Sequence, residues 1–122
     1  MRRRDFQRIV LQALAQVPPR FRAALENIDI QVRWRPTLAE LRRAGLRRGE
    51  MLFGLYLGVP LPQRDHYYSM TLPDTILIYQ QPHERFCRDE AEMVEQVRKT
   101  LLHEIGHYLG IDEDRLQELG VG

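Results

Sequence analysis

The strongest constraint on the fold is a long amphipathic pattern near the end of the chain, over residues 88–109. Apolar side chains recur there at the spacing of one helical face: Met93, Val94, Val97, Leu101, Leu102, Ile105 and Leu109. Asp89, Glu90 and Glu92 complement the positive start of a helix dipole, and Gly110 suits a left-handed stop. The pattern predicts a long helix that buries one face.

Shorter patterns fill the rest of the chain. Helical spacing predicts helices at 5–17 and 19–26, a turn of helix within 37–45, and a last helix at 112–119. Strands are predicted at 28–34, 51–59 and 75–79, and the prolines Pro36, Pro60 and Pro82 follow them as stops. We therefore expect an α+β fold and a single domain over residues 1–122.

The composition narrows the class of protein. With 43% hydrophobic and 29% charged residues, the chain resembles ordinary soluble globular proteins, so we expect a cytoplasmic protein with no membrane partner. Cys87 is the only cysteine, so any metal ligands must be histidines or carboxylates. Arginines crowd the first half, but no nucleic-acid motif accompanies them, and a solvated basic surface is the favoured interpretation.

The segment most typical of chemistry is His103-Glu104-Ile105-Gly106-His107, near the end of the long predicted helix. Histidines at i and i+4 project from one helical face, so both imidazoles can reach one ion at Zn–N distances of about 2.0–2.1 Å. Glu104 lies beside the first histidine, where it can accept the proton of a metal-activated water. We expect a Zn²⁺ site with His103 and His107 as ligands and Glu104 as general base.

A third protein ligand is expected at such a site. Glu113 is our first choice, because a left-handed Gly110 can fold the chain back across the helix end. The open alternatives are Asp112, Asp114, His66 and His83. In a purely structural interpretation, Asp112 caps the last helix, and Glu113 and Asp114 favour its positive end.

The extended motif, His103-Glu104-x-x-His107-x-x-Gly110-x-x-Glu113, resembles the H-E-x-x-H-x-x-G-x-x-D pattern of the Asp-zincins. In particular it resembles the small bacterial family of mini-zincins, or zincin-like metallopeptidase domains. Two further segments look like that family: Leu52-Phe53-Gly54-Leu55-Tyr56-x-Gly58-Val59-Pro60-Leu61 and Pro73-Asp74-Thr75-Ile76. The resemblance implies a minimal zincin fold, with a small mixed sheet packed on the first helix and the motif helix, one zinc ion and peptidase activity. This chain departs from the pattern at Glu113, where the family has Asp.

Other residues have two interpretations each. A strand at 75–79 or 51–57 could bind an extended substrate by backbone pairing, or could be a core strand only. Tyr67, Tyr68, Tyr79 and Tyr108 are candidate oxyanion donors, with ordinary packing favoured for each. We expect His66 and His83 in exposed loops, Cys87 buried or at a helix entry, and Trp34 in the core.

Three functions compete. The first is a zinc-dependent peptidase acting on a peptide or protein substrate. The second is a metal-binding interaction module with little or no proteolytic activity. The third is metal-dependent RNA processing, which is disfavoured because the endoribonuclease family in question uses a third histidine and lacks the residue equivalent to Glu104. A homodimer is left open.

Overall fold

The computed structural model describes residues 1–63 and 74–118. In chain order its elements are α1 (Arg3–Ala15), α2 (Pro19–Arg22), the 3-10 helix η1 (Ala23–Asn27), β1 (Ile28–Arg33), α3 (Leu38–Arg43), β2 (Gly54–Leu57), the 3-10 helix η2 (Leu61–Gln63), β3 (Asp74–Tyr79), α4 (Gln80–Phe86), α5 (Glu90–Tyr108) and α6 (Glu113–Glu118). The predicted α+β class is confirmed. Within the described part of the chain, no helix has the length and apolar character needed to cross a membrane.

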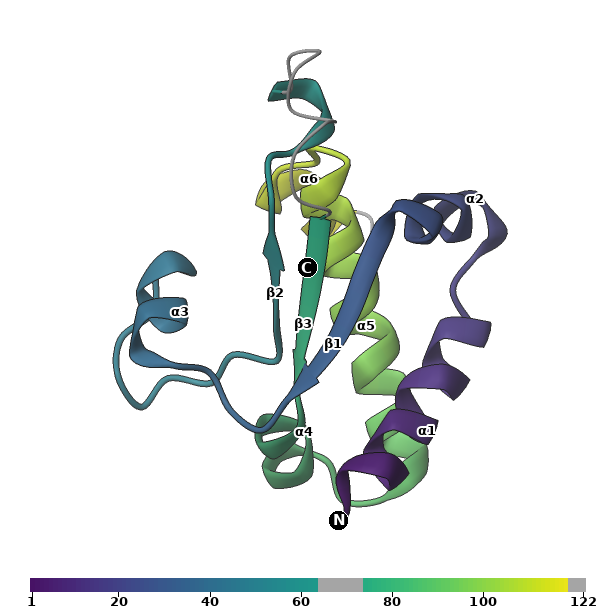
Figure 1. The fold of residues 1–122 in the computed structure, drawn as a ribbon, viewed down its shortest axis with the longest axis vertical. Helices are drawn as coiled ribbons and strands as arrows, with labels where there is room; N and C mark the ends of the chain where they lie inside the picture. The colour runs from purple at the N-terminus through teal and green to yellow at the C-terminus, as the bar shows by residue number, and fades with distance from the viewer. Residues whose placement is uncertain (64–73, 119–122) are drawn as a thin grey trace.

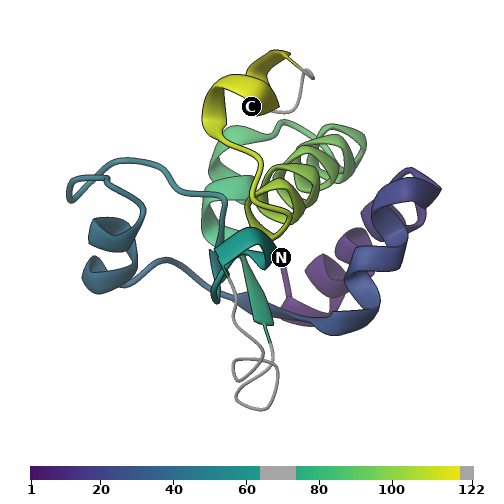
Figure 2. The same cartoon turned by 90° about the horizontal axis from the view of Figure 1, so that it is seen from above.

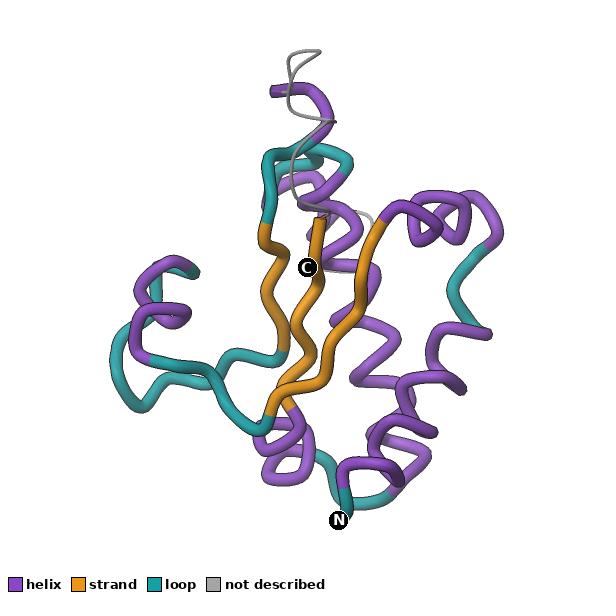
Figure 3. The backbone as a smooth tube through the Cα atoms, in the orientation of Figure 1, coloured by secondary structure: helices purple, strands orange, loops and turns teal. Residues whose placement is uncertain are grey.

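Three strands form a small mixed sheet in the order β1-β3-β2. β1 pairs with β3 in parallel, with Ile28 opposite Asp74 and Arg33 opposite Tyr79. β2 pairs with β3 antiparallel, with Gly54 opposite Ile78 and Leu57 opposite Thr75. β3 is therefore the central strand, and the three lie side by side in Figure 3. Of the two segments considered for backbone pairing with a substrate, 75–79 corresponds to β3, whose two edges are already paired. The other segment, 51–57, contains β2 and remains a candidate.

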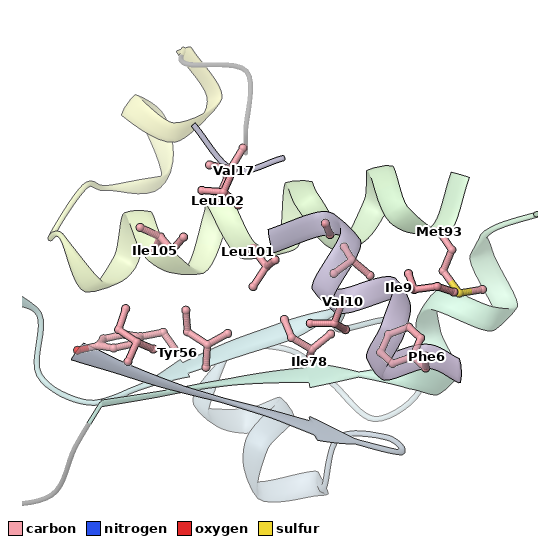
Figure 4. Close-up of a cluster of buried hydrophobic side chains, with 14 of the residues drawn as sticks. Phe6, Ile9, Val10, Val17, Tyr56, Ile78, Met93, Leu101, Leu102 and Ile105 are labelled. Carbon is pink, nitrogen blue, oxygen red and sulfur yellow. The ribbon is translucent and has the colours of Figure 1, made fainter. Parts of the chain in front are cut away.

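Alternation along β3 gives the sheet two apolar faces. Ile76 and Ile78 belong to the main core, whereas Leu77 and Tyr79 join Leu55 in a smaller cluster on the other face. The main core is filled by α1 and α5, which pack on each other and on the sheet (Figure 4). Its fully buried side chains include Phe6, Val97 and Ile105, each of which contributes about 2 kcal/mol by burial.

The helices are distributed unequally around the sheet. α1 lies on the β1 side, next to α5, and α3 stands apart on the β2 side (Figure 1). The view from above shows the same separation of α3 from the α1 and α5 layer (Figure 2). Thr37 begins α3 with a capping box, in which its side chain accepts from the Glu40 backbone and the Glu40 carboxylate accepts from the Thr37 backbone.

Two local expectations need correction, those for His83 and Trp34. β3 ends before Pro82, as expected, and Pro82 lies in the first turn of α4, where a proline loses no helical hydrogen bond. His83 follows it in α4 and is fully buried, not exposed. Trp34 is not a core residue, because it lies just beyond β1 and is 46% exposed. Cys87 is buried next to α5, as expected.

Candidate metal centre

Helix α5 carries the motif and has a defined start and end. At its start, the Asp89 side chain accepts the backbone N–H of Glu92 at 2.8 Å. At its end, Gly110 has a φ of 79°, its N–H donates to the His107 carbonyl, and the Ile111 N–H donates to the Gly106 carbonyl. These two bonds form a Schellman motif, which satisfies the last carbonyls and turns the chain back.

The two histidines lie one turn apart on the same face of α5. Their ring centroids are 4.6 Å apart, and His103, Glu104 and His107 each offer a ligand atom within 4.8 Å of the others. Both imidazoles are partly exposed, whereas the Glu104 side chain is only 7% exposed. The helix thus presents two nitrogen donors to solvent above a buried carboxylate.

Glu104 is fixed by the sheet. Its Oε1 accepts the backbone N–H of Tyr56 in β2 at 2.8 Å and lies 3.3 Å from Nδ1 of His107. Its Oε2 lies 3.9 Å from Nε2 of His103. One carboxylate oxygen is therefore held by the strand, while the other faces the first histidine.

Glu113 meets both histidines from the next helix. Its Oε1 lies 2.9 Å from Nε2 of His103 and 2.7 Å from Nε2 of His107. α6 is capped by Asp112, whose Oδ1 accepts the Arg115 N–H at 2.9 Å. Leu116, 1% exposed, packs α6 onto α5 at Gly106, where an added Cβ would lie 2.4 Å from Leu116 Cδ2. Gly106 therefore permits the close approach that brings Glu113 over the motif.

Comparison with known proteins identifies the family of the chain. The sequence profile of zincin-like metallopeptidases matches residues 25–122. The chain belongs to this family. Among solved structures, a conserved hypothetical protein from Thermo thermophilus is similar in fold, with a TM-score of 0.58 and 21% identity over 88% of this chain and 92% of that chain. No curated protein matches the sequence.

The family membership confirms the resemblance and the fold class inferred from the sequence. The family match begins at residue 25, so α1 lies outside it, although α1 packs along α5 and contributes Phe6, Ile9 and Val10 to the main core. The part of this zincin-like chain that precedes the match is therefore structurally joined to the helix that carries the site.

Electrostatics in the site favour a protonated His107 and an ionised Glu113. A hydrogen bond to Glu104, opposed by burial and helped by Glu113, raises the pKa of His107 to about 9. Burial acts to raise the pKa of Glu113, but the hydrogen bond from His107 and the two imidazoles outweigh it and lower that pKa. Two carboxylates therefore surround two imidazoles. A bound cation would displace the imidazole proton and would supply in its place the positive charge that the carboxylates attract.

The donor set suits zinc. Tetrahedral ligands at Zn–N and Zn–O distances near 2.0 Å stand about 3.3 Å from one another. The Glu113 oxygen now lies 2.9 Å and 2.7 Å from the two Nε2 atoms, so a shift of about 0.5 Å would give room for the ion. Two imidazoles and one carboxylate are a combination that zinc enzymes use. The residues present therefore fit this ion.

The other candidate ligands lie differently. Asp112 is engaged as the cap of α6. His83 is buried, with its ring nitrogens next to the Tyr79 carbonyl and the Thr100 hydroxyl, and it is not part of the His103, Glu104 and His107 group. Tyr79 donates its hydroxyl to Glu40, and Tyr108 packs edge-on against Tyr56. His66, Tyr67 and Tyr68 fall outside the described residues. Asp114 is exposed in the first turn of α6.

A cleft opens next to the motif. It has a volume of about 390 Å³ and is lined by Met51 to Gly54 on one side and by Gln96, Lys99, Thr100, His103 and Glu104 on the other. β2, which continues from Gly54, is an edge strand of the sheet. The cleft thus places strand backbone and the two motif side chains around one space.

The sequence analysis did not identify the residues that hold Glu104 and α6 in position. The Tyr56 N–H that holds Glu104 comes from a strand 48 positions earlier, which no local pattern connects to the motif. The role of Leu116 depends in the same way on how α6 packs. Gly106 did give a signal, because a glycine inside a strong helix commonly marks a close approach.

Proposed function

We propose that this chain is a zinc-dependent metallopeptidase, with His103, His107 and Glu113 as ligands and Glu104 as general base. The observation that carries the proposal is the convergence of three donor atoms, since one oxygen of Glu113 lies 2.9 Å from Nε2 of His103 and 2.7 Å from Nε2 of His107. Family membership supports the metallopeptidase class.

When bound, zinc supplies Lewis acidity, lowering the pKa of water to about 7 and polarising a carbonyl. Glu104 is positioned for the proton transfer. The Tyr56 N–H holds Oε1, so Oε2, on the side of His103, is the atom that receives the proton of the attacking water. Glu104 then passes this proton to the departing amine, which restores the carboxylate.

The cleft supports a polypeptide substrate. Its volume of about 390 Å³ lies within the usual range for ligand sites. Residues 51–54 lead into the edge strand β2, so an extended peptide could lie beside them and present a carbonyl near Glu104. Most of the cleft wall comes from regular or tightly packed backbone, which favours a preformed site.

The test combines zinc content with cleavage. Purified protein, reconstituted with zinc, is analysed by elemental mass spectrometry and incubated with a mixed peptide library. We expect one zinc per chain, its loss in Glu113→Ala, and retention of zinc without cleavage in Glu104→Gln. Glu118→Gln is the matched control, since Glu118 lies on the same helix and pairs with Arg115.

Two results would contradict the proposal. Absence of bound zinc after reconstitution would refute the ligand set. Zinc bound in the wild type, with no peptide cleaved, would instead favour the interaction module.

A further inference from the structure

A second, larger cavity lies beside α3. It has a volume of about 760 Å³ and is formed by the start of α3, the segment 48–52 and the first residues of α4. We call it the arginine groove, because Arg35, Arg48 and Arg85 line it. It contains neither the motif residues nor Glu113.

The groove is electropositive. Arg35, Arg48 and Arg85 are all exposed, and none forms an ion pair with any residue in the described part of the chain. Of the described residues that line it, Glu50 is the only acidic one, so three arginines and one glutamate give this lining a formal charge of +2. Because no carboxylate in residues 1–63 or 74–118 forms an ion pair with these guanidinium groups, we infer that they are available to an anionic ligand.

Between the arginines, the groove is apolar. Leu41 and Pro82 are buried beneath it, and Leu38 and Met51 are 43% and 45% exposed. Exposed large apolar side chains inside a basic rim fit an amphipathic ligand that carries both carboxylates and aliphatic groups. Among the described residues, no aromatic side chain lines the groove, so this part of the chain supplies none of the stacking surfaces that single-stranded nucleic acids use.

The groove is also preformed. The capping box of Thr37 and Glu40 fixes the start of α3, and the buried Tyr79 hydroxyl donates to the same Glu40 carboxylate at 2.8 Å. Tyr79 belongs to the small apolar cluster on this face of the sheet, against which Ala44 and Leu52 pack. The arginines therefore project from a wall tied to the sheet, which lowers the entropic cost of binding.

The groove and the cleft at the metal centre adjoin, because Met51 and Leu52 line both. We propose that the arginine groove binds an acidic, amphipathic polypeptide segment, and that this segment continues into the cleft beside His103 and Glu104. Substrates are then proteins with acidic residues on one side of the cleaved bond. This last statement rests on the proposed peptidase function, whereas binding in the groove does not.

The experiment measures binding separately from cleavage. A fluorescein-labelled peptide of repeated Glu-Asp-Leu triplets is titrated with the Glu104→Gln protein, with anisotropy as the readout, against an otherwise identical Gln-Asn-Leu peptide. We expect the acidic peptide to bind at least about tenfold more tightly, and Arg48→Gln/Arg85→Gln to remove about tenfold of that affinity. Arg3→Gln/Arg4→Gln, with the same change in net charge on α1, is the matched control and should change the affinity less than about twofold.

The outcomes separate the two proposals. Equal loss in both double variants, or equal binding of both peptides, would overturn the groove proposal, because a diffuse charge effect would then explain the data. Tighter binding of a labelled oligouridine than of the acidic peptide, lost with Arg48→Gln/Arg85→Gln, would also overturn it in favour of RNA. Specific binding of the acidic peptide, with no cleavage of it by zinc-loaded wild type that does cleave the mixed library, would support the groove and overturn only the statement about acidic substrates. No cleavage of either would support the groove and refute the peptidase function alone.

Discussion

Buried His83 should make the stability of the protein depend on pH. The imidazole is fully buried between the rings of Phe6 and Phe53, with Nδ1 donating to the Tyr79 carbonyl at 2.6 Å and Nε2 facing the Thr100 hydroxyl at 3.3 Å. Burial lowers its pKa from 6.5 to about 4, and the hydrogen bond to Tyr79 only partly offsets this. In the folded protein His83 is therefore neutral at pH 5.

The sign and size follow from proton linkage. Between pH 6.5 and pH 4 the unfolded chain binds a proton at His83 that the folded chain does not, so acid destabilises the fold in this window. Each unit of pKa difference is worth about 1.4 kcal/mol, which gives about 2 kcal/mol of lost stability between pH 7 and pH 5. Nothing further is lost through this residue once the pH is well below about 4.

Urea denaturation of metal-free wild type and His83→Gln at pH 7 and pH 5 isolates this effect, because the other titrating groups are common to both proteins. At pH 7 the free energy of unfolding of His83→Gln should be lower than that of wild type, since the variant loses packing against two rings. Between pH 7 and pH 5, however, the free energy of unfolding should fall by about 2 kcal/mol less in the variant than in wild type. An NMR titration of the His83 ring gives the same pKa without a variant. Identical pH dependence of the two proteins, or a measured pKa near 6.5, would refute the reasoning.

Two more predictions concern α6 and α3. Gly106→Ala should gain about 1 kcal/mol of helix propensity but lose more to overpacking, because its Cβ would lie 2.4 Å from Leu116 Cδ2. The zinc affinity of Gly106→Ala, measured by calorimetric titration, should be lower than that of wild type, and it should recover in part in Gly106→Ala/Leu116→Ala. Unchanged zinc affinity in Gly106→Ala would mean that α6 does not position Glu113. Tyr79→Phe should cost about 1 kcal/mol in urea denaturation through the lost bond to Glu40, and should weaken acidic-peptide binding. If Tyr79→Phe binds the acidic peptide as tightly as wild type does, the bond between Tyr79 and Glu40 is not needed to hold the arginine groove in shape.

The helices and strands with strong periodicity could be predicted from the sequence. The long helix, the α1 pattern and the three strands are recognisable because apolar spacing reflects burial on one face, and the metal motif is recognisable because its ligands are local. α4 could not be predicted, since a proline directly after a strand is more typical of a loop. The prediction for Trp34 was wrong because alternation near a strand end does not reveal whether another layer covers it.

The geometry of the candidate site could be predicted only in part. The approach of Glu113 to both histidines was anticipated from Gly110, which turns the chain at a positive φ. The hydrogen bond from the Tyr56 N–H in β2 to Glu104 was not anticipated, because it depends on tertiary packing between elements far apart in sequence. The position of the arginine groove also depends on such packing, since its three arginines come from separate segments.

The brevity of α6 has a consequence for metal exchange. A helix as short as α6, described over Glu113–Glu118, is not stable alone, so its attachment depends on Leu116, Asp112 and the contact of Glu113 with α5. The main core formed by α1, α5 and the sheet includes no residue of Glu113–Glu118. On the proposed ligand set, an ion would therefore enter and leave by fraying of the last helix, a local opening far less costly than global unfolding. Zinc exchange would then be fast in a protein that otherwise stays folded.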